Sequence, residues 1–228
     1  MAKGRLRRWL RAIVLAVVVL VLGIYAICAA CVFELRWVDP PTTAVQIERH
    51  IGAIIHHRPY KKRYGFVPIW RISRNLQHAV VSAEDGRFRQ HHGFDWVEMH
   101  KVLEQDIKRH KLGRGGSTIT QQLVKNLFLS TERSLIRKAA EFALVPIVEA
   151  LLTKDRILEL YLNVIEWGPG IYGAQAASEL YYHKPAADLT REEAARLAAI
   201  IPAPLKRKPE WMNEYSEEIL WRMDRAGW

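Results

Sequence analysis

Cysteine is nearly absent from this chain of 228 residues, and its two copies, Cys28 and Cys31, both fall inside one apolar run near the N-terminus. The rest of the chain therefore has no thiol with which to form a disulfide framework. Zinc-finger spacings, a basic zipper and an arginine-rich tail are also missing, so the formal net charge of +10 does not by itself indicate nucleic-acid binding. The nine histidines show no metal-ligand spacing, and no metal site is predicted.

Acidic residues are missing from the first 33 positions. This stretch begins with a basic tail, residues 1–11, and continues with an apolar run, residues 12–33. About 20 apolar residues suffice for a helix that crosses the hydrocarbon region of a bilayer, whereas the apolar region of a cleaved signal peptide has only about 7–15. We therefore predict an uncleaved, single-pass transmembrane helix with its basic N-terminus in the cytoplasm and the remaining chain outside the cytoplasmic membrane.

Alternating β-branched residues are scarce, whereas apolar residues recur at helical spacing from about residue 75 onward. We predict a mostly helical fold, with one domain over residues 70–228 that is large enough to bury a core. Residues 34–69 show no sustained period and are predicted to be a juxtamembrane connector. Two stripes are expected to face the core: Ile157, Leu158, Tyr161, Leu162 and Ile165 in one helix, and Ala194, Leu197, Ala198 and Ile201 in another.

Glu84 and Asp85 are the first candidates for chemistry. Neighbouring residues on a helix point about 100° apart, so one of the two carboxylates is expected to act and the other to support it. Phe88 is expected on the same helical face as Glu84, where an apolar neighbour would raise the pKa of the carboxyl group towards that of a useful base. Such an acidic pair is often only a solvated helix end, but His91 and Asp95 beside it favour a site with Glu84 as general base.

A glycine-rich turn leads into a second polar set. Ser117 or Thr118 is expected to cap a helix, with Gln121 completing a capping box. Capping alone leaves Gln122 and Lys125 unexplained, because they recur with Thr118 at helical spacing and put a hydroxyl, an amide and an ammonium on one face. A helix N-terminus with such a face suits a phosphate group.

Arg137, Lys138 and Glu141 form a third set, in which a guanidinium and a carboxylate are one helical turn apart. An exposed ion pair of this kind is common and contributes only about 0–1 kcal/mol to stability. The set indicates an anion site only in combination with the two preceding ones.

In order and spacing, these segments resemble the signature motifs of the family 51 peptidoglycan glycosyltransferases. The resemblance covers about residues 70–205. The matching motifs are Glu84-Asp85-x-x-Phe88-x-x-His91-x-Gly93-x-Asp95, then Gly115-x-Ser117-Thr118-Ile119-Thr120-Gln121-Gln122-x-x-Lys125-Asn126, then Arg137-Lys138-x-x-Glu141, then Lys154-x-x-Ile157-Leu158-Glu159-x-Tyr161-Leu162-Asn163 with Gly168-x-Gly170-x-x-Gly173, and finally Leu189 to Pro204. Departures from the family pattern are few: Val145, Pro146, Val148 and Tyr182, of which Pro146 is expected to kink its helix.

The resemblance implies a lysozyme-like helical fold with a membrane-abutting lobe, and an enzyme that polymerises lipid II into glycan strands. The enzyme would be anchored in the inner membrane of a bacterium, with its catalytic domain on the external, periplasmic face. The 4-hydroxyl of the N-acetylglucosamine of lipid II would attack the anomeric carbon of a strand held on undecaprenyl pyrophosphate, with inversion. The catalytic residues implied are Glu84, as base, and Glu141, which positions the donor end. The substrate-binding residues implied are Asp85, Phe88, His91, Ser117, Thr118, Gln121, Gln122, Lys125, Asn126, Arg137 and Lys138. Among these, the three cations Lys125, Arg137 and Lys138 would stabilise the departing pyrophosphate, and Asp85 with His91 would order the base. The donor sugar and phosphate would be held by Ser117, Thr118, Gln122 and Asn126.

No cofactor is predicted to be required, although Mg²⁺ or Mn²⁺ could assist the cations. The expected partners are lipid II, the growing glycan strand and the membrane, with cell-division or elongation proteins as further candidates and nucleic acid excluded. Ser-x-x-Lys and Lys-Thr-Gly sequences are missing, so no transpeptidase activity is predicted. Two alternatives stay open: a lysozyme-like lytic transglycosylase and a non-catalytic membrane scaffold of cell-wall synthesis.

Overall fold

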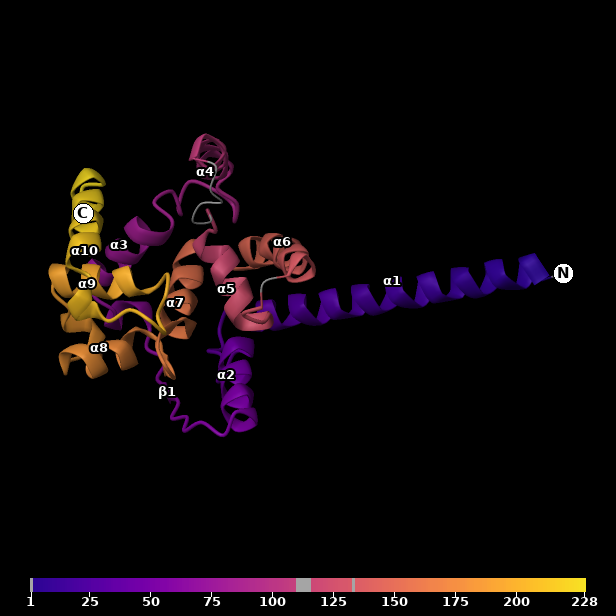
Figure 1. Cartoon of the computed structure of the whole chain (residues 1–228), viewed down its shortest axis with the longest axis horizontal. Coiled ribbons are helices and arrows are strands. Elements are labelled where there is room, and N and C mark those ends of the chain that lie inside the picture. The colour runs from indigo at the N-terminus through magenta and orange to yellow at the C-terminus, as the bar shows by residue number, and fades with distance from the viewer. Residues whose placement is uncertain (1, 110–115, 133) are drawn as a thin grey trace.

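A long N-terminal helix, α1 (Ala2–Glu34), projects from a body of shorter helices in the computed structural model, which describes residues 2–109, 116–132 and 134–228 (Figure 1). Its segment Arg7–Glu34 is long and apolar enough to cross a membrane and contains the predicted run 12–33. The end of α1 belongs to the body, because Val32 is fully buried in the core. Nearer the N-terminus of α1, the Tyr25 hydroxyl donates to the carbonyl of Ala143 in α6.

A second helix, α2 (Ala44–Ile55), occupies the segment in which no sustained period was recognised. Its N-cap is Thr43, whose side chain accepts a hydrogen bond from the backbone N–H of Gln46. The connector between the membrane helix and the rest of the chain is therefore partly helical. The predicted domain start at residue 70 stays a prediction.

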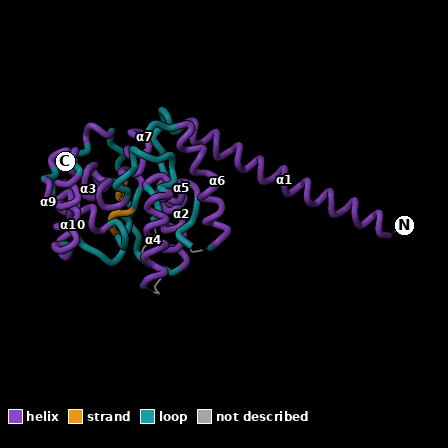
Figure 2. The backbone as a smooth tube through the Cα atoms, turned by 90° about the horizontal axis from the view of Figure 1, so that it is seen from above, coloured by secondary structure: helices purple, strands orange, loops and turns teal. Residues whose placement is uncertain are grey.

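The body is mostly helical, as predicted. Its helices are α3 (Arg74–Glu84), α4 (Trp96–Arg109), α5 (Ile119–Phe128), α6 (Leu135–Leu151), α7 (Lys154–Val164), α8 (Ala174–Tyr182), α9 (Arg191–Ile200) and α10 (Asn213–Arg225), with short 3₁₀ turns η1 (Ile69–Arg71), η2 (Ala186–Asp188) and η3 (Pro209–Trp211). Figure 2 shows these helices gathered at one end of the molecule, with α1 extending away from them.

The described residues form one small sheet in the order β1-β3-β2, from β1 (Arg63–Tyr64), β2 (Glu166–Gly168) and β3 (Ile171–Tyr172). β1 runs parallel to β3, and β2 antiparallel to it. Gly170, in the turn between β2 and β3, has φ of 75° and an ideal Cβ there would lie 2.7 Å from the carbonyl oxygen of Lys61. The position therefore needs glycine, because a side chain would push β1 away.

Both predicted core stripes are buried, on α7 and on α9 with its C-cap, and confirm the helical pattern. α3 packs against both α9 and α10, so two neighbouring helices hold the helix that ends at Glu84. α6 continues through Pro146 to Leu151, so the proline does not end the helix.

Candidate active site

Glu84 is the last residue of α3, where the helix runs out towards a cavity. Ser73 caps the other end by accepting a hydrogen bond from Leu76 N–H, and Leu76 and Val80 are fully buried in the core. Because α3 stops at Glu84, Phe88 does not share a helical face with it, and that part of the prediction is wrong. Phe88 is instead a fully buried core residue with the Lys154 ammonium 4.5 Å from its ring centroid.

The Glu84 carboxylate is held by an amide. Gln122 Nε2 donates to Glu84 Oε2 at 2.6 Å, and the Tyr161 hydroxyl donates to Gln122 Oε1 at 2.9 Å. The tyrosine therefore fixes which end of the amide faces the carboxylate. Burial raises the pKa of Glu84, while the Gln122 hydrogen bond and the Lys125 charge partly oppose the rise.

Asp85 faces away from this contact and ties three segments together. Its Oδ1 lies 2.8 Å from His91 Nε2, and its Oδ2 accepts the backbone N–H of Ile119 at 3.0 Å. The end of α3 is thereby fixed to the start of α5, and the Asp85–His91 pair lies beside Glu84 in the chain. The ordering of the base by this pair stays a prediction.

Asp85, His91 and Asp95 are all buried, and their nearest ligand-type atoms lie within 4.8 Å of one another. Such a set could hold a divalent cation by ligand type. However, Ile119 N–H already satisfies one carboxylate, and Arg87 Nε lies 3.7 Å from Asp95 Oδ2, where its charge would oppose a metal ion. The group fits a hydrogen-bonded brace better than a metal centre.

The predicted capping box at the start of α5 is confirmed. Thr118 accepts from Gln121 N–H, and Gln121 Oε1 accepts from Thr118 N–H at 2.9 Å. The Thr118 hydroxyl also donates to the Gly93 carbonyl at 2.6 Å. Further along, Asn126 Nδ2 donates to the Gln122 carbonyl. Thr118, Gln121 and Asn126 are buried, and these bonds give each of them a partner within the protein.

A group of cations surrounds Glu141, which is only 3% exposed. Arg137 Nη1 donates to Glu141 Oε2 at 2.7 Å, and the Lys138 ammonium pairs with Oε1. Lys125 lies nearby on α5, and burial lowers its pKa, with the Glu141 charge opposing this effect. The predicted pairing is confirmed, but it belongs to a cluster of three partly buried cations around one buried carboxylate, and is not an isolated surface ion pair.

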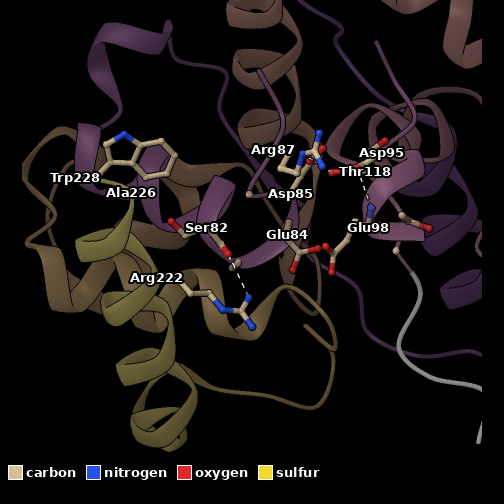
Figure 3. A pocket seen from close by; sticks show the side chains of 14 residues that line it. Ser82, Glu84, Asp85, Arg87, Asp95, Glu98, Thr118, Arg222, Ala226 and Trp228 are labelled. Atoms are coloured by element: carbon tan, nitrogen blue, oxygen red, sulfur yellow. Dashed lines mark hydrogen bonds and ion pairs between the residues drawn. The ribbon is translucent and has the colours of Figure 1, made fainter. Parts of the chain in front are cut away.

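Two cavities meet at Ser117. The first, about 330 Å³, is lined by polar groups that include Glu84, Arg87 and Ser117 (Figure 3). The second, about 620 Å³, is mainly apolar, with Trp96 and Leu103 in its lining, and includes Lys138. The Lys138 ammonium is 3.4 Å from Ser117 Oγ. A ligand with a polar part and a hydrocarbon part could therefore extend from one cavity into the other, past the Lys138 ammonium.

The C-terminal segment forms one wall of the polar cavity, which sequence reasoning did not anticipate. Arg222 on α10 donates to the Ser82 carbonyl at 3.3 Å (Figure 3). The Trp228 ring, also in the cavity lining, stacks on His78 with centroids 4.6 Å apart. Both contacts brace α3 within two turns of Glu84.

The chain is similar to known proteins over most of its length. A family model described as transglycosylase matches residues 51–225, which is most of the chain. The chain belongs to the transglycosylase family. The biosynthetic peptidoglycan transglycosylase of Thiobacillus denitrificans is 50% identical over 199 residues, covering 86% of this chain and 85% of that protein. Proteins of the same description from Janthinobacterium sp. and Laribacter hongkongensis are 41% and 44% identical, over 83% and 74% of this chain and 85% and 74% of their own lengths.

As a transglycosylase, the chain brings its predicted residues together in two groups. Glu84, Gln122 and the Asp85–His91 pair form one, and Lys125, Arg137, Lys138 and Glu141 form the other. The family match begins in α2, ahead of residue 70.

Tyr161 and Arg222 are the neighbours of this transglycosylase site that sequence reasoning missed. The helical spacing predicts Tyr161 in a core stripe, and its ring is indeed buried. A buried tyrosine needs a hydrogen-bond partner for its hydroxyl, and that requirement is the signal that could have drawn attention to it. Arg222 lies on α10 outside every matched motif, and nothing in its spacing indicates the contact.

Proposed function

We propose that this transglycosylase polymerises lipid II into peptidoglycan glycan strands by inverting glycosyl transfer. The observation that carries the proposal is a carboxylate, Glu84, held by an amide at a polar cavity that adjoins a partly buried cation cluster. In the reaction, the 4-hydroxyl oxygen of lipid II forms a bond to the anomeric carbon of the strand. The bond from that carbon to undecaprenyl pyrophosphate breaks, the pyrophosphate keeps the electron pair, and Glu84 takes the hydroxyl proton.

Glu84 suits the role of base because burial raises its pKa, and a base is most effective when its pKa lies nearer to the working pH. Gln122, donating to the carboxylate, stabilises its charged form and fixes its direction. We therefore assign Gln122 to the base and not to the donor sugar. Asp85 and His91 act through the backbone that carries Glu84.

The leaving group is a pyrophosphate, whose departure needs countercharge more than a proton. Hydrolysis of an ordinary glycosidic bond would instead need a protonated carboxyl at that place. Lys125, Arg137 and Lys138 supply fixed positive charge in a partly buried setting, where it acts more strongly than in water. Glu141 holds the last two in place and thereby positions the donor end.

The contacts of the remaining residues divide them into one that can touch the donor and several that hold the site in shape. Ser117 lies where the two cavities meet and next to Lys138, so it is the best candidate for a direct contact with the donor. Thr118, Gln121 and Asn126 make hydrogen bonds that hold α5 in place, and Phe88 is part of the core. Their part in substrate binding is then to shape the site.

The proposed substrate is lipid-linked, so the enzyme must act at the surface of the membrane that holds it. We assign α1 as a single-pass anchor with its basic N-terminus in the cytoplasm and the body on the outer face. The apolar cavity beside Lys138 would then take the first part of the lipid chain, with the sugar in the polar cavity.

Formation of polymer from labelled lipid II in detergent tests the proposal. Wild-type protein should give high-molecular-weight, lysozyme-sensitive product, and Glu84→Gln should lose about 10²–10⁴-fold in rate, the usual value of general base catalysis. Glu217→Gln, a matched change at an exposed position on α10, should keep the wild-type rate. Soluble fragments released from purified cell wall would favour a lytic enzyme, and a folded wild type without product would favour a scaffold.

A further inference from the structure

The helix α2 carries an apolar stripe that no other described part of the protein covers. Ile47, Ile51, Ile54 and Ile55 recur at helical spacing and are 48%, 49%, 61% and 65% exposed. The opposite face of the helix makes the contacts with the body. Isolated exposed isoleucines are ordinary, but four on one helical face indicate a binding surface.

The packed face of α2 is held by polar contacts. Arg49 Nε lies 3.1 Å from Glu166 Oε2, and Glu48 accepts both the backbone N–H and the hydroxyl of Thr131. Gln46 is buried on the same side. The isoleucine stripe therefore cannot turn inward without breaking these contacts.

The place of α2 relative to α1 is also fixed. Arg156 on α7 donates to the carbonyls of Leu35 and Val38, immediately after α1 ends. In Figure 1, α2 lies beside the body end of α1 and runs across the direction of α1, and Figure 2 agrees that it stays with the body. If α1 crosses a bilayer, a helix in this position lies along the surface of that bilayer.

We propose that α2 is an interfacial helix, with its isoleucine stripe in the boundary between headgroups and acyl chains of an anionic bilayer. The inference rests on the proposed function only in that α1 is taken to cross the membrane. Amphipathic helices bind such surfaces through an apolar face together with basic residues.

The residues around α2 have the composition of a membrane interface. Phe33 and Trp37 are exposed where α1 ends, and the Arg36 guanidinium lies 5.0 Å from the Trp37 ring centroid. Aromatic rings of this kind concentrate at the headgroup level. Beyond the helix, Arg58 and Lys61 are exposed and suit anionic lipid headgroups.

Docking of α2 would also set the height of the cation cluster above the membrane. Glu48 holds Thr131, three residues before the N-cap Ser134 of α6, and α6 carries Arg137 and Lys138. With α2 bound at the membrane interface, Arg137 and Lys138 would lie at the level of the pyrophosphate of a lipid-linked substrate.

Site-directed fluorescence in the full-length protein tests the proposal. Cys28→Ala and Cys31→Ala provide a background without thiols, to which Ile51→Cys or the control Glu217→Cys adds one site for an environment-sensitive dye. After reconstitution in phosphatidylcholine vesicles with phosphatidylglycerol, the dye at position 51 should emit at shorter wavelength and be quenched by lipids brominated near the headgroup. The dye at position 217 should show neither effect.

Equal, water-like emission at both positions would overturn the proposal. So would shielding at position 51 that lipid bromine does not quench and that grows with protein concentration, since a second copy would then cover α2. A functional arm compares Ile47→Ser, Ile51→Ser and Ile54→Ser, combined, with the same three positions changed to Leu. The ratio of polymerisation rate in vesicles to that in detergent should fall several-fold for the serine variant only. If no sample makes polymer, the proposed function fails, but the quenching result still decides the role of α2.

Discussion

At the scale of single residues, two opposing effects set the pKa of Glu84. Burial raises it, whereas the Gln122 hydrogen bond and the Lys125 charge lower it by stabilising the carboxylate. The base works only when deprotonated, so kcat/KM should fall as pH drops through this raised pKa. Burial lowers the pKa of Lys125, so this residue should lose its proton as the pH rises, and kcat/KM should then fall at alkaline pH. We expect a bell-shaped pH profile for lipid II polymerisation.

The Gln122 hydrogen bond gives this profile a specific test. Gln122→Met removes a donor to the charged form, so the acid limb should move to higher pH. Tyr161→Phe should move it in the same direction by less, since it frees the amide to turn without removing it. Both profiles can be measured by polymer formation across pH. An unchanged acid limb in both variants would show that the amide does not control the base.

The cost of holding Glu84 also predicts a gain in stability when it is neutralised. Its folded pKa is raised above the unfolded value, so the carboxyl destabilises the fold at pH values above that raised pKa and has no effect below the ordinary carboxyl range. Glu84→Gln should therefore have a higher Tm than wild type at neutral pH, with the difference vanishing at acidic pH. Thermal unfolding in detergent over a pH series measures it, and an equal Tm throughout would contradict the pKa direction.

Residue types and short spacings in the sequence were enough to pick out Glu84 and the Arg137–Glu141 pair, because the latter are neighbours on one helix. They could not show that Gln122 reaches Glu84, since 38 positions separate them and only the fold brings the end of α3 next to α5. Tyr161 and Arg222 were missed for the same reason.

At the scale of secondary structure, the cap of α5 links stability to the site. Thr118 accepts from Gln121 N–H and donates to the Gly93 carbonyl. Thr118→Val keeps the shape of the side chain but removes both bonds, and loss of such a cap costs about 0.5–2 kcal/mol. We expect a lower Tm for Thr118→Val and recovery in Thr118→Ser. Equal melting of all three would mean that the cap does not hold α5.

The α2 helix shows why element prediction failed in one place. Its isoleucines do recur at helical spacing, but the prolines before it and the basic run after it hide the pattern in a longer window. Its packed face uses the polar residues Gln46, Glu48 and Arg49 beside Val45, whereas its isoleucines face outward. A helix with a largely polar packed face cannot be recognised as part of a body from polarity alone.

At the scale of the whole molecule, the junction between the membrane helix and the body depends on one arginine. Arg156 donates to the Leu35 and Val38 carbonyls and pairs with Asp39 and Glu159, while Glu159 accepts the backbone N–H of Ile69. The body and the anchor are therefore joined through a fork of hydrogen bonds that lysine cannot reproduce.

Replacement of this arginine should loosen the joint without removing either part. Arg156→Ala leaves partly buried acceptors unpaired, at about 1–3 kcal/mol for each group that stays out of water. Amide hydrogen exchange over residues 35–42, measured in nanodiscs, should become faster than in wild type, while exchange in the buried helix α9 stays slow. Arg156→Lys should resemble Arg156→Ala more than wild type. Unchanged exchange at 35–42 in both variants would mean that Val32 and the Tyr25–Ala143 bond alone hold the anchor to the body.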